Sequence, residues 1–195
     1  MWALVASAGG VDAVLSILGA LPETVPAAVL VLIHQEPDRA SRLVDVLARQ
    51  SALPVRVAEH GATLFRGEVR VAPPGRHLLV TPGPRTALIR SGVAPPSRPS
   101  ADLLLTTLAI ACGSQATAVV LSGGGHDGAT GATAVHDFGG TVIATDQATS
   151  TVFSMPEATI DRYDVVDHVV PLGDVAGLLR RLAEASPTGS RPERT

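Results

Sequence analysis

The sequence predicts an α/β domain with a doubly wound, mostly parallel sheet flanked by helices. Two observations support this fold class. Short apolar runs alternate with longer segments of helical period, and several of the runs are apolar throughout, as in strands buried on both faces. The 195 residues, of which 46% are hydrophobic and 17% charged, fit one globular domain. We expect this domain to span residues 1–185, and the polar residues 186–195 to form a disordered tail.

The first third of the chain predicts two strands and two helices. Residues 2–6 are an apolar strand, and Gly9-Gly10 introduces a helix over about residues 11–21. Residues 27–33 are a continuous aliphatic run, which is typical of a central parallel strand. Between residues 38 and 50, leucine and valine recur at helical spacing and indicate a second helix.

The pattern then changes over residues 55–93. Several short extended runs are interrupted by proline and glycine, and no helical period fits. We therefore expect a small antiparallel β excursion attached to the main sheet.

The α/β alternation returns after residue 98. Ser100 is a plausible N-cap for a helix over residues 101–112, which precedes a strand at 117–122 and a helix at 127–138. The remaining elements expected are a strand at 141–145, a short helix near 156–162, a strand near 168–170 and a helix over 175–184.

Composition excludes several classes of function. All 15 basic residues are arginine and the chain has no asparagine, so Schiff-base lysines, Walker-type phosphate loops and Cys-His-Asn sites are ruled out. A net charge of −3 with 3% aromatic residues argues against nucleic acid as a partner. With one cysteine, Cys112, no basic leader and no long apolar run, we expect a cytoplasmic protein without membrane insertion.

Three reactive side chains follow predicted strands. Ser7 follows the first strand, His34 the second, and Asp127 lies beyond the strand at 117–122. Because ligands of open parallel sheets bind beyond the carboxyl ends of the strands, neighbouring strands would bring these residues together. A serine nucleophile, an imidazole base and an orienting carboxylate form the set that activates a hydroxyl. The N–H groups of Gly9-Gly10 at a helix start would suit an oxyanion.

Each residue also has a structural interpretation. A serine or aspartate before a helix is commonly an N-cap, and a histidine after a strand often bonds a backbone carbonyl. The remaining histidines show no ligand spacing, so we expect no metal site and assign surface or hydrogen-bonding roles to His60, His77, His126, His136 and His168.

A competing motif lies in the same region. Residues 123–128 read Gly-Gly-Gly-His-Asp-Gly and match the G-x-G-x-x-G pattern of dinucleotide sites, and Asp146 stands near the position of a ribose-binding acid. Against this alternative, the carboxylate of Asp127 would lie where pyrophosphate binds, and the motif falls in the second half of the chain.

Several stretches, in order along residues 2–185, together match a known pattern. They are Ala6-Ser7-Ala8-Gly9-Gly10, His34 with Pro37, Val71-Ala72-Pro73, Arg98-Pro99-Ser100-Ala101-Asp102, residues 122–131 and Val152-Phe153-Ser154-Met155-Pro156. With these stretches the sequence resembles the catalytic domain of the CheB chemotaxis protein-glutamate methylesterases. The resemblance implies Ser7 as nucleophile, His34 as general base and Asp127 as orienting carboxylate, with no cofactor. It also implies a methylated receptor-like protein as substrate, with glutamine deamidation as a second activity of some members.

The sequence departs from that family at several points. Val5 replaces a usual glycine, Ala8 stands where threonine is frequent, and Gly124 stands where methionine is common. We expect the backbone of Ala8, Gly9, Gly10 and Gly124 to support the oxyanion and its loop. The family's usual N-terminal receiver domain has no counterpart before residue 2, so we expect any regulation to come from a separate protein. A catalytically inactive signalling scaffold with the same fold is the further alternative.

Overall fold

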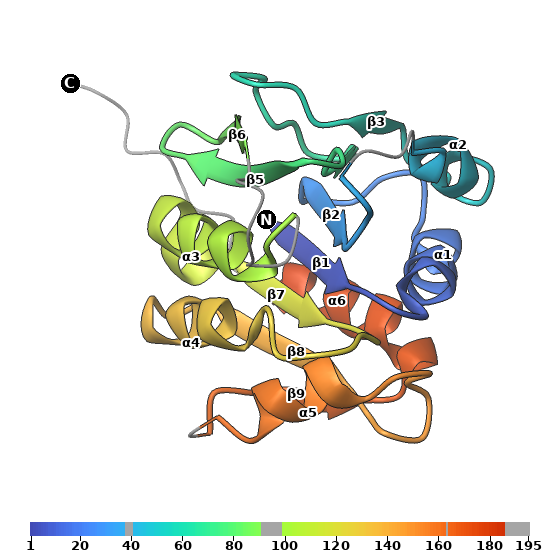
Figure 1. Ribbon diagram of the computed structural model, residues 1–195, viewed down its shortest axis with the longest axis vertical. Coiled ribbons are helices and arrows are strands. Elements are labelled where there is room, and N and C mark those ends of the chain that lie inside the picture. The colour runs from blue at the N-terminus through green and yellow to red at the C-terminus, as the bar shows by residue number, and fades with distance from the viewer. Residues whose placement is uncertain (38–40, 91–98, 163, 186–195) are drawn as a thin grey trace.

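The computed structural model describes residues 1–37, 41–90, 99–162 and 164–185. Its main feature is a seven-stranded sheet in the order β3-β4-β2-β1-β7-β8-β9, with every pair parallel (Figure 1). The predicted fold class is thus confirmed. The strands of this sheet are β1 (Trp2–Ala6), β2 (Val29–Ile33), β3 (Val55–Val57), β4 (Val69–Val71), β7 (Thr117–Val120), β8 (Thr141–Thr145) and β9 (His168–Val170).

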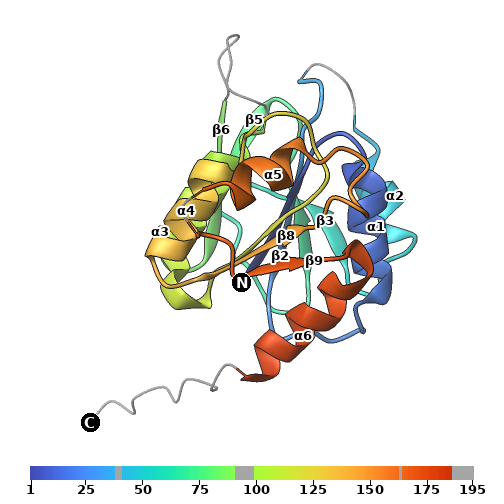
Figure 2. The same cartoon turned by 90° about the horizontal axis from the view of Figure 1, so that it is seen from below.

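Helices cover both faces of the sheet, and Figure 2 shows α3 and α4 on one side of the strands with α1 and α2 on the other. The first layer consists of α1 (Gly10–Ala20), α2 (Leu43–Ala48) and α6 (Val175–Ala185), which share one apolar cluster. The second consists of α3 (Ala101–Cys112), α4 (Ala129–Asp137) and α5 (Ser154–Ile160), which share the other. Two single 3₁₀ turns, Gly113–Gln115 and Leu172–Asp174, precede β7 and α6.

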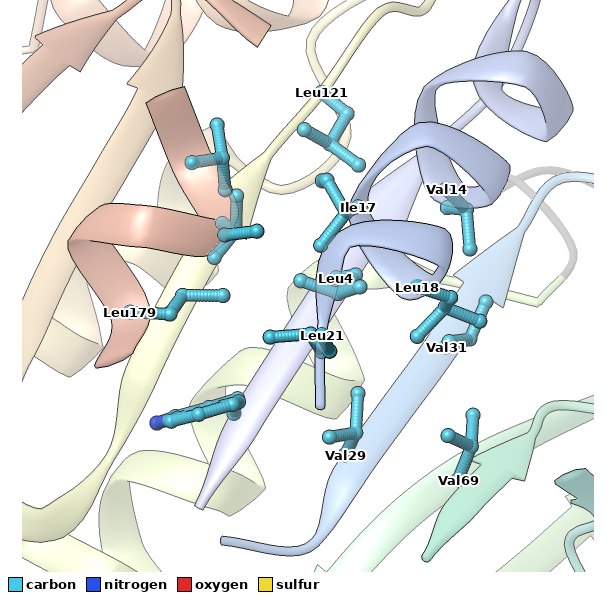
Figure 3. Packing of buried hydrophobic residues seen from close by; sticks show 14 of the residues in the cluster. Leu4, Val14, Ile17, Leu18, Leu21, Val29, Val31, Val69, Leu121 and Leu179 are labelled. Atoms are coloured by element: carbon cyan, nitrogen blue, oxygen red, sulfur yellow. The ribbon is translucent and has the colours of Figure 1, made fainter. Parts of the chain in front are cut away.

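The core explains why the central strands are apolar throughout. All five residues of β1 are buried, and successive side chains enter opposite layers. Leu4 packs with Ile17, Leu18 and Leu121 in the cluster beneath α1 (Figure 3), whereas Val5 belongs to the cluster beneath α3. Burial of each such aliphatic side chain stabilises the fold by about 1.5–3 kcal/mol.

The expected antiparallel excursion is confirmed for part of its range. Strands β5 (Arg76–Thr81) and β6 (Arg85–Arg90) pair antiparallel as a separate hairpin, and β5 packs on α3, where the Val80 N–H donates to Thr107 Oγ1 at 3.1 Å. Strands β3 and β4, also expected in the excursion, instead extend the main sheet in parallel. Each has only three residues, which is too short to express a recognisable period.

Other element boundaries differ only locally. The helix predicted over 38–50 is confined to α2, and residues 38–40, 91–98 and the expected tail at 186–195 lie outside the described residues. Helix α4 begins after residue 128 because Gly128 has a left-handed φ of 106°, which a right-handed helix cannot include.

The strand order reverses beside β1. The chain builds β2 and β4 to one side of β1 and later adds β7, β8 and β9 to the other. In doubly wound sheets this switch point opens a crevice beyond the carboxyl ends of the strands. The segments that follow β1, β2 and β7 therefore meet at one edge.

Candidate active site

Ser7 and His34 leave neighbouring strands side by side. Ala6 and Ile33 are paired in the parallel register of β1 and β2, and the His34 N–H donates to the Ala6 carbonyl at 3.1 Å. On the other side of β1, the Ser7 N–H donates to the Ser122 carbonyl at 3.0 Å. Ser7 is partly exposed, and its hydroxyl makes no hydrogen bond to any other residue that the structure describes. The hydroxyl is therefore open to an incoming group.

The turn that follows Ser7 presents backbone donors. Gly9 adopts a left-handed φ of 76° and caps α1. The Gly10 N–H donates to the Ser7 carbonyl at 2.9 Å, so the expectation that both glycines offer free N–H groups is wrong for Gly10. The N–H groups of Ala8, Gly9 and Gly124 have no acceptor among the described residues. Donors of this kind, close to an open hydroxyl, suit a developing negative charge.

Asp127 holds His34. Its Oδ2 accepts a hydrogen bond from His34 Nε2 at 2.8 Å, with 10% of the aspartate side chain and 16% of the histidine side chain exposed. Burial raises the pKa of Asp127, but the hydrogen bonds from His34 and from the Asp102 and Ala101 N–H groups outweigh it. The pKa of Asp127 therefore lies below its ordinary value. The carboxylate is thus ionised at neutral pH and fixes one ring nitrogen of His34 as a donor.

The same carboxylate closes the N-terminus of α3. Asp127 accepts the Ala101 N–H at 2.7 Å, the Asp102 N–H at 3.0 Å and the Ser100 hydroxyl at 3.1 Å. Ser100 is also the N-cap of α3, as predicted, since its hydroxyl accepts the Leu103 N–H. Three donors besides His34 therefore fix the position of Asp127.

Asp102, in the first turn of α3, caps the start of α4. Its Oδ1 accepts the N–H groups of Gly128 and Gly131 at 2.9 and 2.7 Å, which ties the start of α4 to the start of α3. Burial, with the nearby charge of Asp127 adding to it, raises the pKa of Asp102 despite these N–H groups. Asp102 was not among the predicted site residues, because an aspartate in the first turn of a helix is common and signals nothing by itself.

The 123–128 loop is packed as a support for this cluster. A Cβ on Gly123 would lie 2.2 Å from Met155 Sδ and 2.9 Å from Ser7 Cβ, so the absence of a side chain lets the loop pass directly behind Ser7. Gly124 has open space around it, and nothing in the structure requires glycine there. The Asp102 carboxylate already accepts the Gly128 and Gly131 N–H groups at the start of α4, where pyrophosphate would bind, and Asp146 accepts the N–H and hydroxyl of Thr149. This arrangement does not favour the dinucleotide alternative.

Two of the other histidines bond backbone N–H groups. His77, on β5, is buried and its Nδ1 accepts the Ser100 N–H at 3.0 Å, while His60 Nδ1 accepts the Leu88 N–H. Within the described ranges, no three histidine, cysteine, aspartate or glutamate side chains are grouped as a metal ion would require. None of the helices that the structure describes is long and apolar enough to span a bilayer.

The fold and the site define a parallel α/β domain with a serine, a histidine and an aspartate at its switch point, an arrangement found in hydrolases. Comparison with known proteins gives the family. The family model for CheB methylesterase matches residues 2–179, and the chain belongs to this family.

Individual relatives agree with this assignment. The chain is 39% identical over 180 residues to a protein-glutamate methylesterase/protein-glutamine glutaminase 2 of Anaeromyxobacter dehalogenans (strain 2CP-C), covering 91% of this chain and 51% of that protein. It is 35% identical over 177 residues to protein-glutamate methylesterase FrzG of Myxococcus xanthus, covering 91% and 53%. The chain thus spans about half the length of the curated relatives it matches.

A solved structure matches almost end to end. The CheB methylesterase catalytic domain of Thermotoga maritima superposes with a TM-score of 0.88 at 34% identity. The match covers 93% of this chain and 97% of that domain. The described architecture is therefore that of a methylesterase catalytic domain.

Proposed function

We propose that the protein is a serine hydrolase that cleaves glutamyl methyl esters on a chemoreceptor-like protein. In this proposal Ser7 is the nucleophile, His34 the general base and Asp127 the carboxylate that orients His34. The observation that carries it is the 2.8 Å hydrogen bond between His34 and Asp127 at the end of the strand next to Ser7. The names of the relatives give the substrate class, since they are called protein-glutamate methylesterases.

The hydrogen bond determines which nitrogen of His34 acts as base. A carboxylate only accepts, so Nε2 carries the proton that bonds Asp127. The neutral ring then has its unprotonated lone pair on Nδ1, which is the nitrogen left to take the proton of Ser7. In this proposal a hydrogen bond from the Ser7 hydroxyl to Nδ1 completes the arrangement, and catalytic hydrogen bonds of this kind often tighten only when substrate binds.

The reaction has two steps, the acylation of Ser7 and its deacylation by water. Ser7 Oγ attacks the ester carbonyl carbon while its proton passes to His34, and the carbonyl oxygen becomes an oxyanion near the Ala8, Gly9 and Gly124 N–H groups. The C–O bond to methoxide then breaks, and the proton on His34 leaves with it as methanol. Water attacks the glutamyl-serine ester, again losing a proton to His34. The bond between the acyl carbon and Ser7 Oγ then breaks, Oγ takes the proton back from His34, and glutamate is released. No cofactor takes part in either step.

The same site would accept the amide of a glutamine side chain, since acyl transfer to Ser7 differs only in releasing ammonia. Several of the relatives are named as protein-glutamine glutaminases as well. Methylated receptor-like protein and a separate regulatory protein are the partners we propose, and the cytoplasm is the location. The free thiol of Cys112 is consistent with a reducing compartment.

Methanol release from a receptor peptide carrying a glutamate γ-methyl ester tests this function. We expect turnover by the wild type and a loss of at least about 10³-fold in Ser7→Ala and His34→Ala. Ser114→Ala, which changes an exposed serine before β7, is the matched control and should retain full activity. Undiminished turnover by Ser7→Ala would refute the assigned nucleophile. Failure of folded wild type to release methanol would favour the signalling scaffold.

A further inference from the structure

Ser122 joins the segments that surround the proposed nucleophile. It follows β7 and is 3% exposed. Its hydroxyl donates to the Ala8 carbonyl at 2.7 Å and accepts the Val152 N–H at 2.9 Å, while its own carbonyl accepts the Ser7 N–H. This hydroxyl is therefore both a donor and an acceptor, and each of its partners is a backbone group of another loop.

The hydrogen bond from Ser122 to the Ala8 carbonyl fixes the orientation of the peptide between Ala8 and Gly9. The Ala8 carbonyl and the Gly9 N–H belong to one trans peptide, in which the two groups point in opposite directions. Since the carbonyl is held on Ser122, the Gly9 N–H is held pointing away from Ser122, and it has no acceptor among the described residues. An oxyanion donor must be an unpaired N–H with a fixed direction. Gly9, two residues after Ser7, has such an N–H.

We propose that Ser122 is a positioning residue that aims the Gly9 N–H at the oxyanion of the reaction. It acts through the backbone and does not itself contact substrate. The inference rests on the proposed function of Ser7, and it extends that function by assigning one oxyanion donor and the side chain that orients it.

Glycine at position 9 is part of this arrangement. A Cβ on Gly9 would lie 2.8 Å from Ser122 Oγ and 2.7 Å from Thr151 Cβ, and the residue has a φ of 76°. A side chain there would therefore displace the Ser122 hydroxyl from the Ala8 carbonyl.

A purely structural role for Ser122 makes a different prediction. The hydroxyl also bonds Val152, whose carbonyl accepts the Gly123 N–H, so its removal would lower the free energy of unfolding in either case. If structure were its only role, the folded fraction of the variant would turn over at the wild-type kcat. If Ser122 orients an oxyanion donor, its loss raises the energy of the transition state more than that of the bound substrate. kcat then falls and KM stays near its wild-type value.

The kinetic test compares Ser122→Ala, Ser122→Thr and Thr86→Val on the γ-methyl ester peptide, with each protein's folded fraction measured. Thr86 is the matched control, since it is 1% exposed and its hydroxyl bonds the Glu59 and Ala62 carbonyls far from Ser7. We expect kcat of Ser122→Ala to fall by about 10- to 100-fold with KM within about threefold of wild type. Ser122→Thr, which keeps a hydroxyl, should recover most of this loss, and Thr86→Val should leave kcat unchanged.

A second measurement is independent of turnover. In ¹³C,¹⁵N-labelled protein, Ser122→Ala should shift the Ala8 carbonyl resonance toward that of a carbonyl without a hydrogen bond, and the Gly9 amide should become more mobile. Thr86→Val should change neither signal. Unchanged Ala8 and Gly9 resonances in Ser122→Ala, or an unchanged kcat in an active enzyme, would overturn the inference. Absence of hydrolysis by wild type would instead count against the function of Ser7, and the resonances would still decide whether Ser122 holds this peptide.

Discussion

Removal of the Asp127 carboxylate should cost both stability and activity, because this one group accepts hydrogen bonds from His34, Ser100, Ala101 and Asp102. Hydrogen bonds to a charged acceptor contribute about 1.5–3 kcal/mol each, but they share one desolvation cost and are not additive. The side chain is only 10% exposed, so its removal leaves these donors poorly solvated.

From these contacts we expect Asp127→Ala to lower the free energy of unfolding by about 3–5 kcal/mol, as when one partner of a buried pair is removed. Asp127→Asn keeps the shape and one acceptor oxygen, so its cost should be about 1–2 kcal/mol. Its activity should nevertheless fall by about 10³- to 10⁴-fold, because a neutral amide can stabilise the wrong tautomer of His34.

Urea unfolding followed by circular dichroism measures the stabilities, and methanol release measures the activities. Asp167→Asn is the matched control, since its carboxylate accepts the Val142 N–H at 2.8 Å near the start of β8, away from the site. That variant should lose some stability and no activity per folded molecule. An Asp127→Ala protein whose free energy of unfolding lies within about 0.5 kcal/mol of wild type would show that these hydrogen bonds do not stabilise the fold.

Three further predictions follow from particular contacts. The pKa of Asp127 is lowered in the folded state, so its stabilisation is complete above the unfolded pKa of about 3.9 and is lost as the pH falls through the lower folded value. The stability difference between wild type and Asp127→Asn should therefore narrow below about pH 4, and a constant difference in urea unfolding would contradict this. Gly123→Ala should cost about 1–3 kcal/mol because its Cβ meets a buried sulfur, whereas Gly124→Ala, in open space, should stay within about 0.5 kcal/mol; equal melting temperatures would refute this packing argument. The buried Arg70–Glu68 pair, 3.0 Å apart, predicts a loss of about 3–5 kcal/mol for Glu68→Leu and a smaller loss when Arg70→Met is added, and a larger loss in the double variant would contradict it.

Much of the fold was predictable because its central elements have strong local patterns. The bounds of β1, β8 and α3 agree with the prediction, since each is either a fully apolar run or a helix with a serine N-cap. Strands β3 and β4 were not placed, because both read Val-Arg-Val and their partners are determined by the tertiary structure. The burial of Arg70 in β4, paired with Glu68, is likewise visible only once the sheet is assembled.

Some residues of the candidate site could likewise be predicted from the sequence, and others could not. Ser7, His34 and Asp127 could be selected from the sequence because reactive side chains that follow parallel strands lie at the same edge of the sheet. Ser122 and Asp102 carry no such signal, since their roles depend on which backbone groups reach them from other loops. The free N–H groups also had to be read from the structure, because the Gly10 N–H is taken by the Ser7 carbonyl.

Covalent labelling tests whether Ser7 is the nucleophile. Folded protein would be treated with a fluorophosphonate, which forms a stable ester with an activated serine, and the modified residue mapped by mass spectrometry. We expect a single adduct on Ser7 that is absent from Ser7→Ala and strongly slowed in His34→Ala. An adduct on another serine, or no adduct in protein shown to be folded, would contradict it.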